Sequence, residues 1–170
     1  DIVYAYRHRN IDQLLRIGAK KVELLRSWFI PWLNKPIHTN DKEMKEIPND
    51  IVFVGHFEFD NRVRLLVSIV RECWKLKLYG PGCDWDPVIK NSKELANQVP
   101  VKLVWGDDYN KALCSGKIAL CFLSKLNSDT YTRRCFEIPA TGTMLLSEYS
   151  DDLASLFKEG KEADFFKSEE

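Results

Sequence analysis

The sequence predicts an α/β domain with a doubly wound parallel sheet, and two observations lead to this fold class. Short runs of Val, Ile, Leu and Phe recur along the chain, and segments with apolar side chains at helical spacing separate them. Strands buried on both faces have this continuous apolar character, and their alternation with helices is typical of a parallel sheet covered on both sides.

The alternation starts near residue 10 and becomes strict after residue 50. Residues 10–18 have apolar side chains at helical spacing and end in a glycine, and residues 22–25 form a strand-like run. Residues 27–50 contain three prolines, which favour a connector lying over a surface. Beyond the connector, strands are predicted at residues 51–55, 75–82, 101–106, 117–123, 144–148 and 162–166, and helices at residues 61–73, 91–98, 108–116, 129–142 and 150–160.

The composition is that of a globular protein with no dominant charge. Lys plus Arg and Asp plus Glu number 25 each, so no net field attracts a polyanion, and nucleic acid is a poor first choice of partner. Hydrophobic residues make up 45% and charged residues 29%, which argues against disorder. No apolar run approaches the roughly 18–20 residues of a membrane span, and the start has no signal-peptide pattern. We therefore expect a cytoplasmic chain without a transmembrane segment, and a peripheral membrane contact stays open.

Cysteine and histidine give no metal or redox signature. The five cysteines are odd in number, lie singly among apolar neighbours and form no close pair such as C-x-x-C. They are expected to be small buried side chains in a reducing compartment, with no metal site. The cysteines are Cys73, Cys83, Cys114, Cys121 and Cys135, and the three equally scattered histidines are His8, His38 and His56.

The loops that follow the strands hold the candidate site, because ligands of doubly wound sheets bind at the carboxyl ends of the strands. The first of these loops has Gly55 at a tight exit, and then Asp60 or Asn61 as a helix cap directly before Arg62. A cation in the first turn of a helix opposes the helix dipole, and a bound phosphate is one reason to place Arg62 there. A solvated arginine on a polar helix face is the alternative.

A second candidate loop closes the strand at residues 101–106. Trp105 and Gly106 would offer an aromatic face and open backbone to a planar base. A core aromatic explains Trp105 equally well.

The polar stretch at residues 128–142 carries the strongest candidates. Arg133 and Glu137 are four residues apart and therefore share one helix face. An ordinary surface ion pair has the same spacing. The setting favours burial, because the adjacent residues are apolar and Pro139 kinks or ends so short a helix.

The polar residues of this stretch suit the hydroxyl and phosphate groups of a phosphorylated ligand. Glu137 lies next to a bend where Gly142 lets backbone approach closely, and its carboxylate suits a ribose diol because it accepts two hydroxyl hydrogen bonds. Arg133, Thr130 and the helix start suit phosphate oxygens. Asp129 is anionic and would repel phosphate, so it fits better as a helix cap or as a partner for sugar hydroxyls.

The order of these motifs resembles a known family. The run RRCFEIPATGTMLLSEYSDDLASLFKEGKEADFFKSEE is similar to the closing segment of group 1 glycosyltransferases, particularly the branch of CgeB-like spore maturation proteins. That branch has arginine, a variable residue, Phe-Glu, small or apolar residues, glycine, an apolar strand and then a helix. The likeness continues upstream through IVFVGHFEFDNRVRLL, KLYGPG and VWGDDYNKALCSGKIALCF, so it covers nearly the whole chain.

The resemblance implies a GT-B architecture, in which two Rossmann-like domains enclose the active site between them. Residues 39–170 would be the C-terminal, nucleotide-sugar-binding half of such an enzyme. Residues 1–38 would be the tail of the N-terminal domain and the connector between the domains.

The resemblance also implies roles for individual residues. The family's glutamate that ends an acid-x7-acid motif binds the donor's ribose, and Glu137 matches it. The first acid, near the donor sugar, falls on Asp129 as the implied catalytic residue, although the family usually has glutamate there. The basic residue that contacts phosphate matches Arg62 or Arg64. Arg133 and Thr130 would line the diphosphate, and residues 104–106, which include Trp105 and Gly106, would line the base.

The implied activity is transfer of a glycosyl group from a nucleoside diphosphate sugar to an unknown acceptor, which would be a glycan, a protein or a lipid. Neither a metal nor another cofactor is expected, and the anomeric configuration would be retained. The acceptor-binding domain would be missing from this chain, so the fragment alone is expected to bind the donor weakly and to transfer nothing.

Two alternatives to a transferase stay open. One is a non-catalytic α/β nucleotide-binding or protein-interaction module, whose partner would dock on the aromatic residues 27–32. The other is a nucleotide-dependent sugar epimerase of the same two-domain architecture. An epimerase requires pairs of histidine and carboxylate in the cleft, and the sequence offers only His56 near a strand exit.

Overall fold

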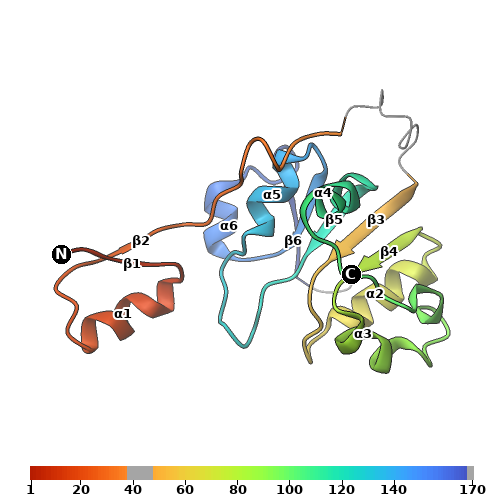
Figure 1. Cartoon of the computed structure of the whole chain (residues 1–170), viewed down its shortest axis with the longest axis horizontal. Coiled ribbons are helices and arrows are strands. Elements are labelled where there is room, and N and C mark those ends of the chain that lie inside the picture. The colour runs from red at the N-terminus through yellow and green to blue at the C-terminus, as the bar shows by residue number, and fades with distance from the viewer. Residues whose placement is uncertain (38–47, 168–170) are drawn as a thin grey trace.

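The computed structural model describes residues 1–37 and 48–167. These residues form two β-sheets of unequal size (Figure 1). The predicted boundary between residues 38 and 39 lies outside the described residues, as does His38. The elements in chain order are β1 Val3–Ala5, α1 His8–Arg16, β2 Val22–Leu24, β3 Asn49–Val54, α2 Arg62–Arg71, β4 Leu76–Tyr79, α3 Gly82–Ile89, the 3₁₀ helix η1 Ala96–Gln98, α4 Gly106–Cys114, β5 Gly116–Cys121, α5 Arg134–Ala140, β6 Met144–Glu148, α6 Asp151–Leu156 and β7 Asp164–Phe166.

The larger sheet has the strand order β4-β3-β5-β6-β7, and every neighbouring pair is parallel. An isolated parallel β-bridge pairs Tyr79, at the end of β4, with Lys102. The segment before α4 therefore lies along the outer edge of β4. The chain thus moves outward from β3 through β4, returns to β5 beside β3, and moves outward the other way. This reversal defines the doubly wound fold that the sequence predicts, and it leaves a crevice at the carboxyl ends of β3 and β5.

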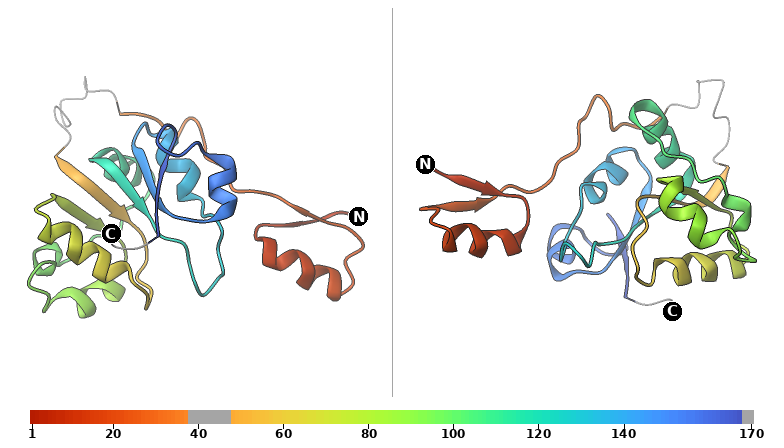
Figure 2. Two further views of the ribbon diagram at one scale, coloured as in Figure 1. Left: turned by 180° about the vertical axis from the view of Figure 1, so that it is seen from behind. Right: turned by 60° about the horizontal axis from the view of Figure 1, so that its bottom comes forward.

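Helices cover both faces of the larger sheet, because successive side chains of a strand point to opposite faces. In β3, Val52 and Val54 join a buried cluster with side chains from α4, α5 and α6. The intervening Ile51 and Phe53 join a second cluster with α2 and α3 on the other face. Figure 2 shows the helices on both sides of the sheet.

Several predicted elements differ from the structure between β4 and β5. Helix α3 is missed because Pro87 interrupts its pattern, although the helix continues through that position. The helix expected at residues 91–98 is wrong, since only η1 is helical there. The strand expected at residues 101–106 is reduced to the bridge at Lys102. In each case the segment packs through a few buried side chains rather than through a regular repeat.

The expected helix starts are also shifted. Helix α5 begins at Arg134, five residues later than expected, so Asp129 and Thr130 lie in the preceding loop and cap nothing. Asn61 stands at the start of α2 without a side-chain cap, while the Asp60 carboxylate accepts a hydrogen bond from the backbone N–H of Arg62.

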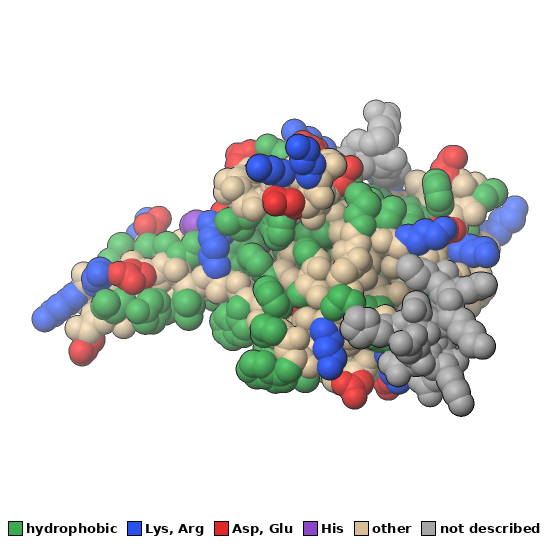
Figure 3. Space-filling view, turned by 90° about the horizontal axis from the view of Figure 1, so that it is seen from above, with side chains coloured by type: hydrophobic (Ala, Val, Ile, Leu, Met, Phe, Trp, Pro, Cys, Tyr) green, Lys and Arg blue, Asp and Glu red, His purple; other side chains and the backbone are tan. Residues whose placement is uncertain are grey.

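Residues 1–26 form a small N-terminal unit in which β1 and β2 pair in parallel around α1. Helix α1 buries none of its residues, and apolar side chains such as Tyr4 and Ile17 are exposed. Figure 3 shows hydrophobic side chains along this unit, at the left of the view. A two-stranded sheet this short has too little core to be stable alone, so its placement depends on contacts with the larger sheet.

Those contacts include the edge-to-face packing of Tyr6 on Tyr131, with ring centroids 5.6 Å apart, and polar contacts that converge on two carboxylates. The Asp152 carboxylate accepts two hydrogen bonds from the Arg26 guanidinium, at 2.5 and 2.9 Å, and one from the Thr130 hydroxyl at 2.7 Å. Nε2 of His8 lies 3.0 Å from the same carboxylate. The Asp129 carboxylate forms an ion pair with Arg7. These bonds join the N-terminal unit to the loop that precedes α5 and to the first turn of α6.

None of the helices formed by residues 1–37 and 48–167 has both the length and the apolar character needed to cross a bilayer.

Replacing Asp152 with Asn tests the attachment of the N-terminal unit. Burial raises the pKa of Asp152, but hydrogen bonds from Arg26 and Thr130 outweigh burial and lower this pKa from 3.8 to about 2. A depressed pKa stabilises the folded state above the unfolded-state pKa, and the contribution is lost as the pH falls through the folded-state value. At neutral pH we expect Asp152→Asn to lower the free energy of unfolding by about 1–2 kcal/mol.

The measurement is urea denaturation of both proteins between neutral pH and pH 2. The difference in unfolding free energy should shrink as wild-type Asp152 becomes protonated. Asp151→Asn is the matched control, because Asp151 contacts only the Tyr149 hydroxyl in the described structure. An equal difference at both ends of the pH range contradicts the assignment.

Candidate functional site

The candidate site is a pocket of about 340 Å³ at the carboxyl ends of β3 and β4, on the face covered by α4 and α5. This volume is within the range of small-ligand sites, and the pocket lies at the carboxyl-end edge of the sheet, where doubly wound folds bind their ligands. Four segments supply its walls: the turn after β3, the turn after β4, the start of α4 and the first turn of α5. Its lining residues are Val54, Gly55, His56, Gly80, Pro81, Leu103, Val104, Trp105, Gly106, Tyr109, Arg133, Arg134 and Glu137.

Glu137 is the buried carboxylate of this pocket, with a residue exposure of 6%. Its Oε2 accepts a hydrogen bond of 2.6 Å from the Tyr109 hydroxyl, and its Oε1 lies 2.7 Å from Nε of Arg133. The Arg133 side chain is half-exposed and lies against the Trp28 ring, with its guanidinium carbon 5.9 Å from the ring centroid. A buried charge costs several kcal/mol unless it is paired and hydrogen-bonded, and these two partners satisfy that need. The carboxylate keeps lone pairs for a ligand.

Tyr109 stays protonated in this arrangement. Burial, followed by the negative charge of Glu137, raises the pKa of the Tyr109 phenol well above its ordinary value of 10. The hydroxyl is therefore a fixed donor to Glu137. This bond joins α4 to α5 across the pocket wall.

Arg134 is the half-buried cation of the pocket. Its Nε is buried and has no hydrogen-bond partner among the described residues. The guanidinium lies next to Gly55, since a Cβ atom added there would come within 3.6 Å of its Cζ. Burial disfavours the charged form, but the neighbouring Cys121 and Tyr109 outweigh burial, and the pKa of Arg134 is raised. A half-buried guanidinium with an unused donor is suited to an anionic ligand.

Close backbone packing forms one wall of the pocket. A Cβ atom on Gly80 would lie 2.2 Å from the Gly55 carbonyl oxygen, so this position accepts no side chain. The same oxygen accepts a hydrogen bond of 2.9 Å from Nε1 of Trp85. The pocket's mouth is formed by Trp105, which is 74% exposed, and by Gly106, whose φ of +54° favours glycine. The core-aromatic alternative for Trp105 is therefore wrong.

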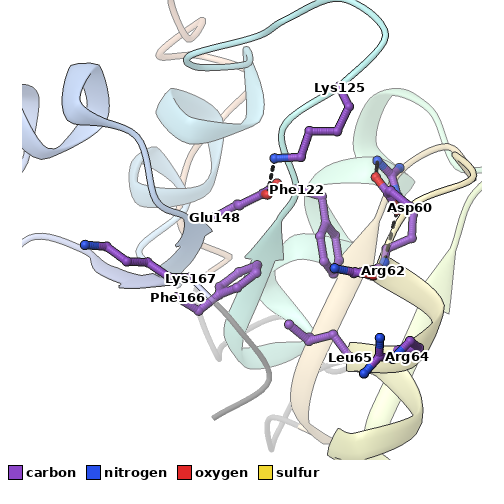
Figure 4. Close-up of a pocket in the computed structure, with 10 residues that line it drawn as sticks. Asp60, Arg62, Arg64, Leu65, Phe122, Lys125, Glu148, Phe166 and Lys167 are labelled. Atoms are coloured by element: carbon purple, nitrogen blue, oxygen red, sulfur yellow. Dashed lines mark hydrogen bonds and ion pairs between the residues drawn. The ribbon is translucent and has the colours of Figure 1, made fainter.

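Arg62 lies in a second, larger pocket of about 620 Å³ on the other face of the sheet (Figure 4). Its guanidinium donates to both Asp60 carboxylate oxygens at 2.6 and 2.7 Å, and to the His56 carbonyl at 2.5 Å. It also lies over the Phe122 ring, 5.4 Å from the centroid. Asp60 therefore explains a cation at the start of α2, and neither a phosphate nor a solvated surface position is needed. Arg64 lines this second pocket too, away from Glu137.

Three other predicted residues lie outside the candidate site. The Asp129 carboxylate is only 6% exposed and pairs with Arg7 of the N-terminal unit. Thr130 donates its hydroxyl to Asp152. Gly142 follows α5 and lines a separate pocket near the amino ends of β6 and β7. The structure thus brings together Gly55, Trp105, Gly106, Arg133 and Glu137, and separates them from Arg62, Asp129, Thr130 and Gly142.

Arg134 and Tyr109 line the pocket but are not among the site residues predicted from the sequence. Arg134 stands beside the chosen Arg133, and the order arginine, variable residue, Phe-Glu singles out Arg134 as the arginine of the pattern. Tyr109 has no local signal, because its partner Glu137 lies 28 positions away in the sequence.

The prediction for the cysteines is only partly right. Cys121 and Cys135 are buried, but Cys73 and Cys83 are exposed. The two buried thiols are also close in space, with their sulfur atoms 3.5 Å apart. Among the residues that the structure describes, no group of three or more His, Cys, Asp or Glu side chains is arranged to hold a metal ion.

A pocket with one buried carboxylate, one half-buried guanidinium and an exposed tryptophan has the groups that bind hydroxyls, an anion and a planar ring. The fold around it is a Rossmann-like half of the GT-B type. Sucrose-phosphate synthase from Thermosynechococcus elongatus has a similar structure, with a TM-score of 0.61 and 15% sequence identity. The match covers 97% of this chain and 45% of that protein's chain. None of the curated protein sequences matches this chain.

A family defined as glycosyl transferase-like matches residues 62–170. This match includes α2 through β7 and therefore most of the pocket. The chain belongs to this glycosyl transferase-like family.

Replacing Tyr109 with Phe tests the buried bond between α4 and α5. The change removes only the hydroxyl and leaves Oε2 of Glu137 without its donor, so we expect a loss of about 1–3 kcal/mol in the free energy of unfolding. Urea denaturation measures the loss. The matched control is Tyr149→Phe, because the Tyr149 hydroxyl bonds to an exposed carboxylate that water can solvate. Equal effects of the two changes would show that Glu137 does not depend on Tyr109.

Proposed function

We propose that the pocket binds a nucleoside diphosphate sugar, and that the chain is the donor-binding half of a glycosyltransferase related to the CgeB-like branch. One observation carries this proposal: Glu137 and Arg134 line the same pocket at the carboxyl ends of parallel strands, one as a buried acceptor and the other as a half-buried cation whose buried Nε has no hydrogen-bond partner among the described residues. Membership of the glycosyl transferase-like family supports the proposal.

Glu137 and Trp105 would bind the nucleoside. Each carboxylate oxygen of Glu137 already accepts one bond from the protein, and a second lone pair on each suits the two hydroxyls of a ribose. Tyr109 and Arg133 hold the carboxylate in place for this contact. The exposed ring of Trp105 at the pocket's mouth would stack on the base.

Arg134 would bind the diphosphate. The sequence predicts Arg62 for this role instead. The unused Nε of Arg134 and its position beside Gly55 allow a phosphate to approach both the guanidinium and the backbone. Arg133 also lines the pocket and would add positive charge. In glycosyl transfer, negative charge builds up on the departing diphosphate, and fixed cations stabilise it most effectively in a site shielded from water. These cations would perform that role without a metal or another cofactor.

The acceptor would bind to a second domain, of which the N-terminal unit would be a part. In this proposal Asp129 anchors that unit through Arg7 and does not touch the donor. Transfer with retention, and inactivity of residues 1–170 alone, are the outcomes that we expect for such a donor-binding half.

A nucleotide-binding module without transferase activity is the second candidate. The ion pair between Asp129 and Arg7 favours it, because the acid expected next to the donor sugar is held away from the pocket. Both candidates require a functional pocket. They differ in whether a complete two-domain protein releases the nucleoside diphosphate in the presence of a sugar acceptor.

Calorimetric titration with UDP and GDP tests the proposed pocket. We expect Glu137→Ala to weaken nucleotide binding by about 1–3 kcal/mol, roughly 5- to 150-fold in Kd, because two charge-assisted hydrogen bonds are lost. Arg134→Ala should weaken binding of the diphosphate more than binding of the free nucleoside. Its control is Arg71→Ala, since Arg71 is an exposed arginine at the far end of α2.

Trp105→Ala should weaken binding of every nucleotide whose base stacks on the ring. Trp74→Ala is its matched control, because Trp74 is exposed to a similar degree and precedes β4 at the other end of the sheet. Absence of binding for both nucleotides, or equal binding by the Glu137 variant and the wild type, would rule out the site.

A further inference from the structure

Cys121 and Cys135 form a thiol pair directly behind the candidate pocket. Cys121 is the last residue of β5, and Cys135 is the second residue of α5. Both side chains are fully buried, and their sulfur atoms are 3.5 Å apart. A disulfide bond has a length of about 2 Å, so the sulfurs need to approach by roughly 1.5 Å.

The surroundings of the pair are polar for a buried site. The Thr132 hydroxyl lies 3.4 Å from Sγ of Cys121, and the Thr132 backbone N–H donates to Sγ of Cys135 at 3.4 Å. The positive guanidinium of Arg134 is close enough to act on both thiols. A purely structural cysteine pair in a core lacks such donors and such a charge.

These groups distinguish the two sulfurs chemically. A hydrogen bond from the Cys135 thiol, followed by the charge of Arg134, outweighs burial and lowers the pKa of Cys121. The same shared proton, together with burial, raises the pKa of Cys135. Of the two thiols, Cys121 is thus the more acidic. A thiolate beside a second thiol is the arrangement that oxidises reversibly.

We propose that Cys121 and Cys135 are a redox-active pair, which hydrogen peroxide converts into a disulfide between β5 and α5. The Cys121 thiolate attacks one oxygen of the peroxide, so an S–O bond forms, the O–O bond breaks, and hydroxide leaves as water after taking up a proton. The Cys135 sulfur then attacks the Cys121 sulfur, the S–S bond forms, and the S–O bond breaks; the departing hydroxide takes up the proton of the Cys135 thiol and leaves as a second water. The thiol pair loses two electrons, and the peroxide gains them.

The pair is reached from the candidate pocket. Arg134 lines that pocket and also interacts with Cys121, so its side chain links the ligand space to the thiol pair. A nucleotide bound to Arg134 would close this approach. This link to the pocket rests on the proposed function, whereas disulfide formation does not.

The test begins with the full chain in which the other three cysteines are replaced by serine. After treatment with hydrogen peroxide under native conditions, we expect the intact protein to lose two hydrogens. Tryptic digestion should give residues 118–125 cross-linked to residues 135–158. Dithiothreitol should reverse the change.

Single replacements in the same background separate the two roles. Cys135→Ser should stop the reaction at a Cys121 sulfenic acid that dimedone traps, whereas Cys121→Ser should leave Cys135 unmodified. Circular dichroism verifies the fold of both variants. In the wild type, the exposed Cys73 and Cys83 serve as internal references for peroxide reactivity. If these two are oxidised while Cys121 and Cys135 stay reduced in the folded protein, the proposal is overturned.

Adding UDP or GDP tests the approach through the pocket. A nucleotide that binds by calorimetry should slow disulfide formation severalfold. Unchanged kinetics with a nucleotide that binds would overturn the link to the pocket. Disulfide formation in a protein that binds no nucleotide would support the thiol pair and contradict the proposed function.

Discussion

The constraint on which the site depends is that the strands of the larger sheet are buried on both faces. Adjacent residues of one strand therefore belong to different cores, and the end of β5 shows the consequence. Cys121 points toward α5 and lies behind the candidate pocket, whereas Phe122 points the other way and lies under Arg62. Two consecutive residues thus lie next to two pockets with different chemistry. The face of the sheet to which a side chain points therefore decides which pocket it lies near.

Arg62 and Arg134 lie on opposite faces of the sheet and differ in whether the protein itself supplies hydrogen-bond partners for the guanidinium. Arg62 and Arg134 both stand at the start of a helix after a strand; Arg62 is buried, and Arg134 is half-buried with a fully buried Nε. Asp60 satisfies Arg62 with bidentate hydrogen bonds, while Nε of Arg134 has no partner among the described residues. A buried donor without a partner is costly in a stable protein, and a ligand that accepts its bond removes that cost. This contrast, rather than charge alone, is the reason for proposing Arg134 as the anion-binding residue.

The sequence predicted the alternation of strands and helices because hydrophobic periodicity is a local property. It also predicted the burial of Glu137, since Pro139 and the apolar neighbours are adjacent to it in the chain. It failed where the partner is distant: Arg7 lies 122 positions from Asp129, and Tyr109 lies 28 positions from Glu137. No local pattern reveals such pairs, so Asp129 was placed at the donor sugar although it holds the N-terminal unit. The shift of α5 to Arg134 has the same origin, because Thr130 and Asp129 bind other loops instead of capping the helix.

The first turn of α5 connects the chemical features of the molecule. Arg133, Arg134, Cys135 and Glu137 are close in sequence, yet each faces a different partner: the Trp28 ring, the pocket next to Gly55, the Cys121 sulfur and the Tyr109 hydroxyl. A seven-residue helix has little stability of its own, so its position is set by these contacts. A change in any of them shifts the carboxylate and the guanidinium together. The geometry of the pocket is thus tied to the state of the thiol pair, because Arg134 and Cys135 are consecutive residues on the same turn.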